Sequence, residues 1–183
     1  MARIRPVDPT VAEGKARDLL GGVQKALGTV PNMMKTMAHS PAVLQAYLGF
    51  SQVLGGGKLS ARLREQIALA VAGENHCEYC ASAHAYLGGK LGVDRHEAAA
   101  NICGSSSDPK VSAALEFARV VVAKRGWVGD TDVQRLRDAG YGDAELVEIL
   151  ATVALNVFTN YFNHVAQTEV DFPKVDLAVP AAA

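Results

Sequence analysis

The chain is poor in cysteine and in net charge, and both shortages narrow the range of functions. Its 183 residues include three cysteines, and the formal net charge at pH 7 is −1. The sequence also has no cluster of lysine and arginine of the kind that binds the phosphates of nucleic acids. We therefore expect no nucleic acid among its partners.

Long apolar runs are missing as well. The N-terminal stretch MARIRPVDPT has no apolar segment of the kind found in signal peptides, and no run approaches the ~20 apolar residues of a membrane span. These absences favour a cytoplasmic protein without a membrane segment. In a reducing compartment, a Cys-x-x-Cys pair is redox-active or metal-binding more often than it is structural.

The apolar residues, 49% of the chain, recur at helical spacing, and no convincing alternating strand pattern is found. We expect an all-α fold, a compact bundle of eight or nine helices in a single domain over residues 1–183. A short arm (residues 1–8) and an extended tail (residues 172–183) flank it. The predicted helices cover residues 9–27, 32–39, 41–55, 61–73, 77–91, 95–102, 109–125, 131–139 and 143–168.

Local signals mark the ends of these helices. A capping side chain precedes a proline at Asp8, Ser40 and Asp108, and near capping boxes begin at Asp94 and Thr131. Six glycines stand where helices should end: Gly28, Gly55, Gly73, Gly92, Gly126 and Gly140.

The most informative stretch reads EQIALAVAGENHCEYCASAH and spans residues 65–84. Its first half predicts a helix that is apolar on nearly all sides and therefore enclosed by other helices. A second helix should start near Cys77. In that helix Cys77, Cys80 and His84 are spaced i, i+3 and i+7, so they lie on one stripe.

This arrangement favours thiol chemistry. A helix N-terminus stabilises a thiolate over a thiol, and the thiolate is the nucleophile. A second cysteine can condense with a sulfenic acid to form a disulfide. His84 can carry the proton, and Glu65, twelve residues before Cys77, can orient His84 if the two helices pack antiparallel.

The spacing of these four residues resembles the core signature of the AhpD-like alkylhydroperoxidases, which belong to the carboxymuconolactone decarboxylase superfamily. The resemblance covers roughly residues 40–105. It implies that Cys80 is the thiolate that attacks the peroxide and that Cys77 is the proton donor and resolving partner. It also implies that His84 and Glu65 relay the proton. The decarboxylases of the superfamily lack the cysteine pair, which argues against lactone decarboxylation.

The resemblance also implies the setting of the reaction. The substrate would be a hydroperoxide, and the reductant an external thiol or dithiol, such as a lipoyl or thioredoxin-like protein. The protein would be a homo-oligomer, a trimer or hexamer, and the chemistry needs no metal or organic cofactor. One departure is Tyr79, which stands where some members have histidine; His76 precedes the pair but is not the equivalent position.

Two alternatives remain open on the residues alone. Cys77, Cys80, His84 and Glu65 are all acceptable zinc ligands, although no second ligand pair of the usual spacing exists. The chain could also be a non-redox member of the superfamily that binds a small molecule or acts as a scaffold. Cys103 has no partner in the sequence, and we interpret it as structural.

The last predicted helix carries a line of uncharged polar residues between two apolar stripes. The line consists of Thr152, Asn156, Thr159, Asn163 and Gln167, joined by Asn160 and His164. Such groups most often hydrogen-bond neighbouring helices. Alternatively, Asn160 or His164 lines the thiol pocket, together with Tyr79 and His76.

The arm and the tail carry apolar residues in segments too short to form a core of their own. These residues are Ile4, Val7, Leu177 and Val179. We therefore expect both segments to embrace a neighbouring subunit.

Overall fold

The computed structural model describes residues 2–177, and within this range the chain is helical and has no strand. The helices are α1 (Gly14–Leu27), α2 (Asn32–Met37), α3 (Pro41–Gly55), α4 (Ala61–Glu74), α5 (Glu78–Gly89), α6 (Arg95–Ile102), α7 (Pro109–Ala123), α8 (Asp130–Asp138) and α9 (Asp143–Ala166). The all-α prediction is confirmed. No helix in these residues is long and apolar enough to cross a membrane.

Helix α4 is the centre of the bundle. It contacts α5, α6, α7 and α9. Its residues Leu69 and Ala72 belong to one buried apolar cluster, while Ile67, Ala70 and Val71 belong to a second one. The enclosure predicted for this helix is therefore confirmed, because both of its sides are covered.

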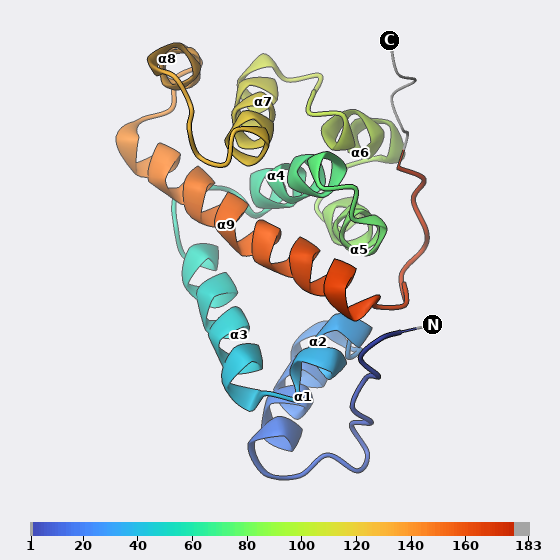
Figure 1. Ribbon diagram of the computed structural model, residues 1–183. Helices are drawn as coiled ribbons and strands as arrows, with labels where there is room; N and C mark the ends of the chain where they lie inside the picture. The colour runs from blue at the N-terminus through green and yellow to red at the C-terminus, as the bar shows by residue number, and fades with distance from the viewer. Residues whose placement is uncertain (1, 178–183) are drawn as a thin grey trace.

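Helix α9 divides the molecule. Figure 1 shows it crossing the fold, with α1, α2 and α3 on one side and α4 to α8 on the other. The first apolar cluster joins α1, α2 and α3 to α5, and the second joins α4 to α7, α8 and α9. Cys77 and Cys80 belong to the first cluster.

Side-chain caps explain several helix starts. The Ser60 hydroxyl accepts a hydrogen bond from the Leu63 amide, and the Asp94 carboxylate accepts one from the Glu97 amide. Asp108 likewise accepts hydrogen bonds from the amides of Lys110 and Val111. The starts predicted at Asp94 and Asp108 are thus confirmed.

The start predicted at Asp8 is wrong. The Asp8 carboxylate accepts hydrogen bonds from the amide and the hydroxyl of Thr10, which closes a local turn, and α1 begins only at Gly14. The start predicted at Thr131 is displaced. Gly129 is the N-cap of α8, and its amide donates to the carboxylate of Asp132.

Gly73 is the next-to-last residue of α4, so the helix end predicted there is correct to within one residue, but its role is a close contact. A Cβ atom built on it would lie 2.0 Å from the carbonyl oxygen of Ile102 in α6. The glycine is there because the backbones of α4 and α6 approach each other closely, which no other residue allows.

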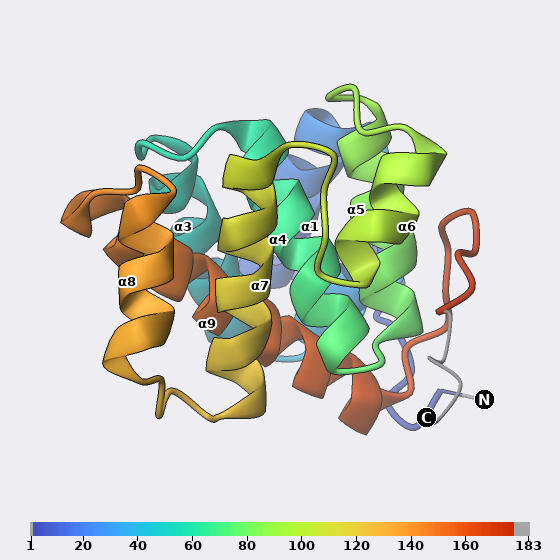
Figure 2. The same ribbon diagram turned by 90° about the horizontal axis from the view of Figure 1, so that it is seen from above.

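After α9 the chain turns at Gln167, which has a left-handed backbone (φ 52°). The following segment, residues 167–177, is called the C-terminal strap. Figure 2 shows it on the α6 side of the molecule, at the opposite edge from α8. The Val175 amide donates to the Ser82 hydroxyl of α5 (3.2 Å), and the Lys174 ammonium lies 3.3 Å from the Glu78 carboxylate. Residues 172–177 form neither helix nor strand.

The arm also packs on its own chain. The Arg3 amide donates to the Ala166 carbonyl at the end of α9. Val7 and Leu177, expected to cover a neighbouring subunit, instead pack against the first apolar cluster. Ile4 is exposed, and Val179 lies outside the described residues.

Candidate active site

The two cysteines meet at the start of α5. Cys77 is the N-cap of this helix, and its sulfur accepts a hydrogen bond from the Cys80 amide at 3.4 Å. The two sulfur atoms are 2.7 Å apart, and both residues are buried thiols. A disulfide has an S–S distance of about 2.05 Å, so the pair can close with a shift of less than about 1 Å.

Glu65 and His84 form the second pair. The packing of α4 against α5 brings the Glu65 carboxylate to 2.7 Å from Nδ1 of His84. A carboxylate on Nδ1 holds the proton on that nitrogen and leaves Nε2 to exchange protons elsewhere. The four residues singled out in the sequence thus lie on two adjacent, contacting helices.

Asn163 is the residue that the sequence pattern did not single out. Its Nδ2 atom lies 3.3 Å from the Cys80 sulfur and 3.3 Å from the Met33 sulfur, and its Oδ1 atom is buried without a partner. The signal was present, since Asn163 belongs to the polar line of α9. The two positions singled out from that line were instead Asn160 and His164.

Asn160 and His164 lie in different surroundings. The Oδ1 atom of Asn160 accepts a hydrogen bond from Asn75 (3.0 Å), while its Nδ2 atom is buried without a partner. The Asn160 carboxamide makes a small contribution to lowering the pKa of Cys80, although no hydrogen bond joins it to the sulfur in the described residues. His164 is exposed on the outer side of α9.

The surroundings make Cys80 the more acidic thiol. Burial opposes its ionisation, but the Cys77 thiol, the charge of His84 and the carboxamides of Asn163 and Asn160 together lower the pKa of Cys80 to about 7. The hydrogen bond with Cys80, together with burial, raises the pKa of Cys77. At neutral pH Cys80 is therefore ionised to a much greater extent than Cys77.

Neighbouring charged groups also shift the pKa of His84. Burial disfavours the charged form of His84, but the Glu65 carboxylate and the Cys80 sulfur outweigh it and raise the pKa of His84 above 6.5. These neighbours therefore favour the protonated form of His84, and its positive charge in turn favours the Cys80 thiolate.

Cys80 and His84 line a cavity of about 420 Å³. Its deep end is formed by buried residues of α2, α4, α5 and α9, and exposed residues of α1, α3 and α5 surround its mouth. Tyr79 forms part of the wall: its hydroxyl accepts a hydrogen bond from the Met33 amide (3.1 Å), and its ring meets that of Phe172 edge-on. The strap therefore closes one side of the cavity.

Cys77 faces a different hollow. This open depression, of about 470 Å³, lies on the outer surface and is also lined by His76 and His164. The residues expected around the thiols are therefore divided. Tyr79 borders both spaces, whereas His76 and His164 lie only on the Cys77 side.

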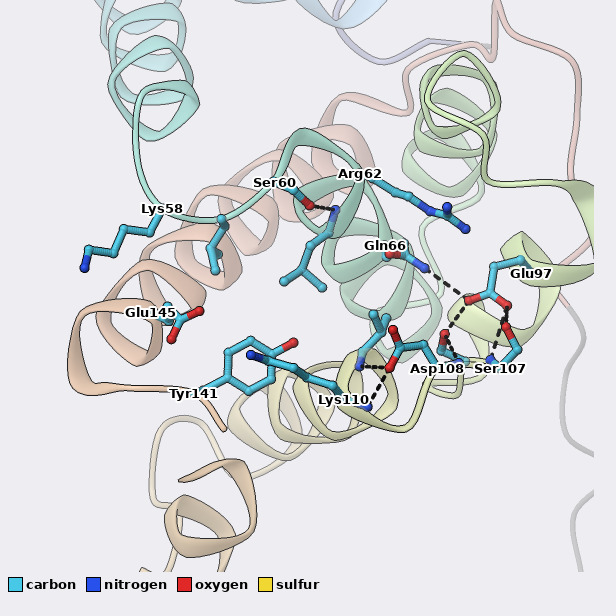
Figure 3. Close-up of a pocket in the computed structure, with 14 residues that line it drawn as sticks. Lys58, Ser60, Arg62, Gln66, Glu97, Ser107, Asp108, Lys110, Tyr141 and Glu145 are labelled. Carbon is cyan, nitrogen blue, oxygen red and sulfur yellow. Dashed lines mark hydrogen bonds between the residues drawn. The ribbon is translucent and has the colours of Figure 1, made fainter. Parts of the chain in front are cut away.

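A third hollow, of about 350 Å³, lies away from the cysteines and is shown in Figure 3. Its central acid, Glu97, accepts hydrogen bonds from Gln66, Asn101, Ser106 and Ser107. Burial opposes ionisation, but these hydroxyls and amides lower the pKa of Glu97 to about 2. Because the carboxylate is already satisfied by its neighbours, this network ties α6 to the loop before α7.

The cysteine geometry also bears on the zinc alternative. Two thiolates at Zn–S distances of about 2.3 Å in a tetrahedral site are separated by roughly 3.7 Å. The sulfurs of Cys77 and Cys80 are 2.7 Å apart, so they would have to separate by about 1 Å to hold one zinc ion. Within residues 2–177, no three or more His, Cys, Asp or Glu side chains are arranged to hold a metal.

Comparison with known proteins supports the family expected from the motif. The model of the carboxymuconolactone decarboxylase family matches residues 41–123. No curated protein sequence matches the chain significantly.

Solved structures share the fold at low sequence identity. The AhpD-core, peroxidase-related protein of Ralstonia eutropha JMP134 is 24% identical, with a TM-score of 0.84 over 93% of this chain and 92% of that one. A peroxidase-related protein of Silicibacter sp. TM1040 is 23% identical, with a TM-score of 0.79 over 91% and 92%.

A third structure is a cysteine-to-alanine variant of the debrominase Bmp8 in complex with 2,3,4-tribromopyrrole. It is 21% identical, with a TM-score of 0.78 over 92% of this chain and 91% of that one. The chain therefore has the AhpD-like fold, and its residues 41–123 match the model of the carboxymuconolactone decarboxylase family.

Proposed function

We propose that the protein is a thiol-dependent hydroperoxide reductase that cycles Cys77 and Cys80 between dithiol and disulfide. The observation that carries the proposal is the 2.7 Å separation of the two sulfurs, of which Cys80 lines a cavity beside the Glu65–His84 pair. A nucleophile, a resolving thiol and a proton carrier are then within reach of one substrate.

In the first step the Cys80 thiolate attacks the terminal oxygen of the hydroperoxide. The S–O bond forms as the O–O bond breaks, and the alkoxide leaves with a proton from His84. Glu65 stabilises the imidazolium before the transfer and holds the ring in place. The products are an alcohol and a sulfenic acid on Cys80.

In the second step Cys77 attacks the Cys80 sulfur. The S–S bond forms, the S–O bond breaks, and the hydroxyl group leaves as water with the proton of the Cys77 thiol. The raised pKa of Cys77 keeps that proton available until this step. An external thiol or dithiol, of the lipoyl or thioredoxin-like class, then reduces the disulfide by exchange through Cys77.

The proposal extends to the cellular setting. We expect a cytoplasmic protein that assembles as a homo-oligomer, a trimer or hexamer, and needs no metal or organic cofactor for this cycle. Size-exclusion chromatography with light scattering would give the subunit number directly.

Reductive dehalogenation is a second candidate. The cavity that contains Cys80 is also lined by aromatic and thioether side chains, namely Tyr47, Tyr79, Tyr86, Phe172, Met33 and Met34. Such walls suit a flat halogenated ring. The thiol pair would supply the two electrons that replace a carbon–halogen bond by carbon–hydrogen, releasing halide and leaving the same disulfide.

The test is a free-thiol titration of the reduced, chelator-treated protein before and after one equivalent of hydroperoxide, with intact mass. We expect the rapid loss of two thiols, restored by a dithiol, in the wild type and in Cys103→Ser. Cys103 is exposed and distant in the chain from the pair, which makes it the matched control. Cys80→Ser should lose no thiol to the peroxide; full activity of that variant would rule the scheme out.

Further measurements on the same protein distinguish the remaining alternatives. Zinc in freshly purified protein, with thiols inert until a chelator is added, would support a metal-binding module. Thiols that ignore peroxide but are consumed with release of bromide from a bromopyrrole would support dehalogenation. Thiols that stay unchanged in every assay would support a non-redox member.

A further inference from the structure

The cavity has a polar, reactive end and a distant cationic end. Cys80, Leu87 and Lys90 line it from the same helix or its C-cap, and Cys80 is buried whereas Lys90 is exposed. Ten residues of helix correspond to roughly 15 Å. The cavity therefore extends along α5, from the thiolate inside to an ammonium group at the mouth.

The wall between these ends is mainly apolar. It is built from side chains of α1, α2, α3, α4, α5 and α9, including Leu27, Met34, Leu54, Ala68, Leu87 and Leu155. A cavity of about 420 Å³ with such a wall is far larger than hydrogen peroxide needs. The space suits a hydrocarbon chain of medium or greater length.

Three charged side chains besides His84 line the cavity. Glu65 is paired with His84, whereas the half-buried Arg64 guanidinium donates to the Leu59 carbonyl, a contact that orients Arg64 but does not neutralise it. The Lys90 ammonium lies 4.4 Å above the ring of Tyr86, and no carboxylate of the described part of the chain forms a salt bridge with it. Tyr86 thus holds Lys90 over the cavity without neutralising it.

We infer that the preferred substrate is an anionic, amphipathic hydroperoxide, such as a fatty acid hydroperoxide. Its carboxylate would bind Lys90, its chain would lie along the apolar wall, and its peroxide group would reach Cys80. This inference rests on the proposed function. The reaction is the same two-electron step, which converts the hydroperoxy acid to the hydroxy acid while the two thiols become a disulfide and water leaves.

The test compares kcat/KM for linoleic acid hydroperoxide, its methyl ester and tert-butyl hydroperoxide. The wild type should favour the acid over the ester by about 2–5-fold, the value of one exposed ion pair, and the ratio should fall as salt is added. In Lys90→Gln the ratio should approach one, and in Lys90→Glu the ester should become the better substrate. Lys15→Gln, a matched change of an exposed lysine in α1 away from the cavity, should keep the wild-type ratio.

An acid-to-ester ratio of one in the wild type, or a ratio unchanged in Lys90→Gln, would overturn the inference. Loss of the proposed function gives a different result, because then none of the three peroxides, including tert-butyl hydroperoxide, is reduced. In that case calorimetry with linoleate and methyl linoleate on Cys80→Ser still tests the site. Tighter binding of the anion that disappears in the Cys80→Ser, Lys90→Gln double variant would support it, and equal binding would refute it.

Discussion

The Nδ2 atom of Asn163 lies 3.3 Å from the sulfur of Cys80, although 83 residues separate them in the chain. The amide donates toward the sulfur and therefore favours the thiolate over the thiol. Helix α9 thus supplies a group that tunes the nucleophile, while α4 and α5 supply the nucleophile and its proton carrier.

Replacing Asn163 by leucine should raise the pKa of Cys80 by about 1–2 units, because a hydrogen bond to a charged group is worth about 1.5–3 kcal/mol. In the wild type, the rate of Cys80 alkylation should decrease as the pH falls through about 7. In the variant the loss should occur at higher pH. The measurement is the pH profile of iodoacetamide labelling, read at Cys80 by mass spectrometry in the Cys103→Ser background. Superimposable profiles would show that Asn163 has no part in tuning the thiol.

Glu65→Gln should lower the pKa of His84, because it removes the charge that raises it. A smaller fraction of His84 is then protonated at pH 7, which weakens the charge that lowers the pKa of Cys80. Peroxide-dependent oxidation at pH 7 should slow by roughly 10–100-fold. An NMR titration of the histidines measures the pKa of His84 in both proteins. An equal pKa in the variant and the wild type would contradict the role given to Glu65.

The same pair makes the stability of the protein depend on pH. The folded pKa of His84 lies above the unfolded value of 6.5, so the stabilisation is complete below pH 6.5 and is lost as the pH rises through the folded pKa. In Glu65→Gln this loss should disappear from urea unfolding curves recorded across that range.

Gly73→Ala should destabilise the fold by about 3 kcal/mol, the upper end of the usual cost of overpacking. The added Cβ would meet the Ile102 carbonyl, a backbone atom that cannot rotate away. Gly22→Ala is the matched control in α1, where nothing lies within 4 Å of the added atom, and it should stabilise the protein by about 0.5–1 kcal/mol. Urea midpoints that move in the same direction for both variants would count against this reading of the α4–α6 contact.

Phe172→Ala should open the strap side of the cavity. The ring contacts those of Tyr79 and Tyr86, with centroids 5.8 and 5.7 Å away. Loss of these contacts should lower the free energy of unfolding by about 1–3 kcal/mol. It should also increase the rate at which bulky maleimides label Cys80. Phe50→Ala, an exposed phenylalanine of α3 that does not line the cavity, should leave the labelling rate unchanged.

Glu97→Gln should remove part of the acid sensitivity of the protein. The pKa of Glu97 is lowered from 4.5 to about 2, so its stabilisation is complete above pH 4.5 and is lost as the pH falls toward 2. The variant should be less stable at pH 7, by about 1–2 kcal/mol, and its stability should fall less between pH 4.5 and 2. Glu116→Gln, an exposed site with only a 3.4 Å contact to Arg135, is the control for a general charge effect.

The parts of the molecule that could be predicted are those with local causes. Helix periodicity located all nine helices within the described residues, and the register of Cys77, Cys80 and His84 follows from helix geometry alone. The helix start predicted at Asp8 was wrong because its carboxylate closes a turn with Thr10 instead of capping a helix.

The parts that were missed depend on packing between distant segments. The sequence indicated the helix end near Gly73 but not the close approach of α6, which requires a glycine at this position. Asn163 was one of several polar residues of α9, and only the crossing of α9 over α5 determines which of them meets the sulfur. Likewise, no local signal indicated that Phe172 would cover the cavity.

Asn163 follows Cys80 in the chain, so it is synthesised later than the thiol whose pKa it lowers. A ribosome adds the cysteine pair and Glu65 well before it adds α9, so the unfinished chain has both thiols but lacks the carboxamides that lower the pKa of Cys80. In the proposed mechanism the Cys80 thiolate is the nucleophile, so this nucleophile would reach its lowered pKa only when α9 has been synthesised and packed against α5.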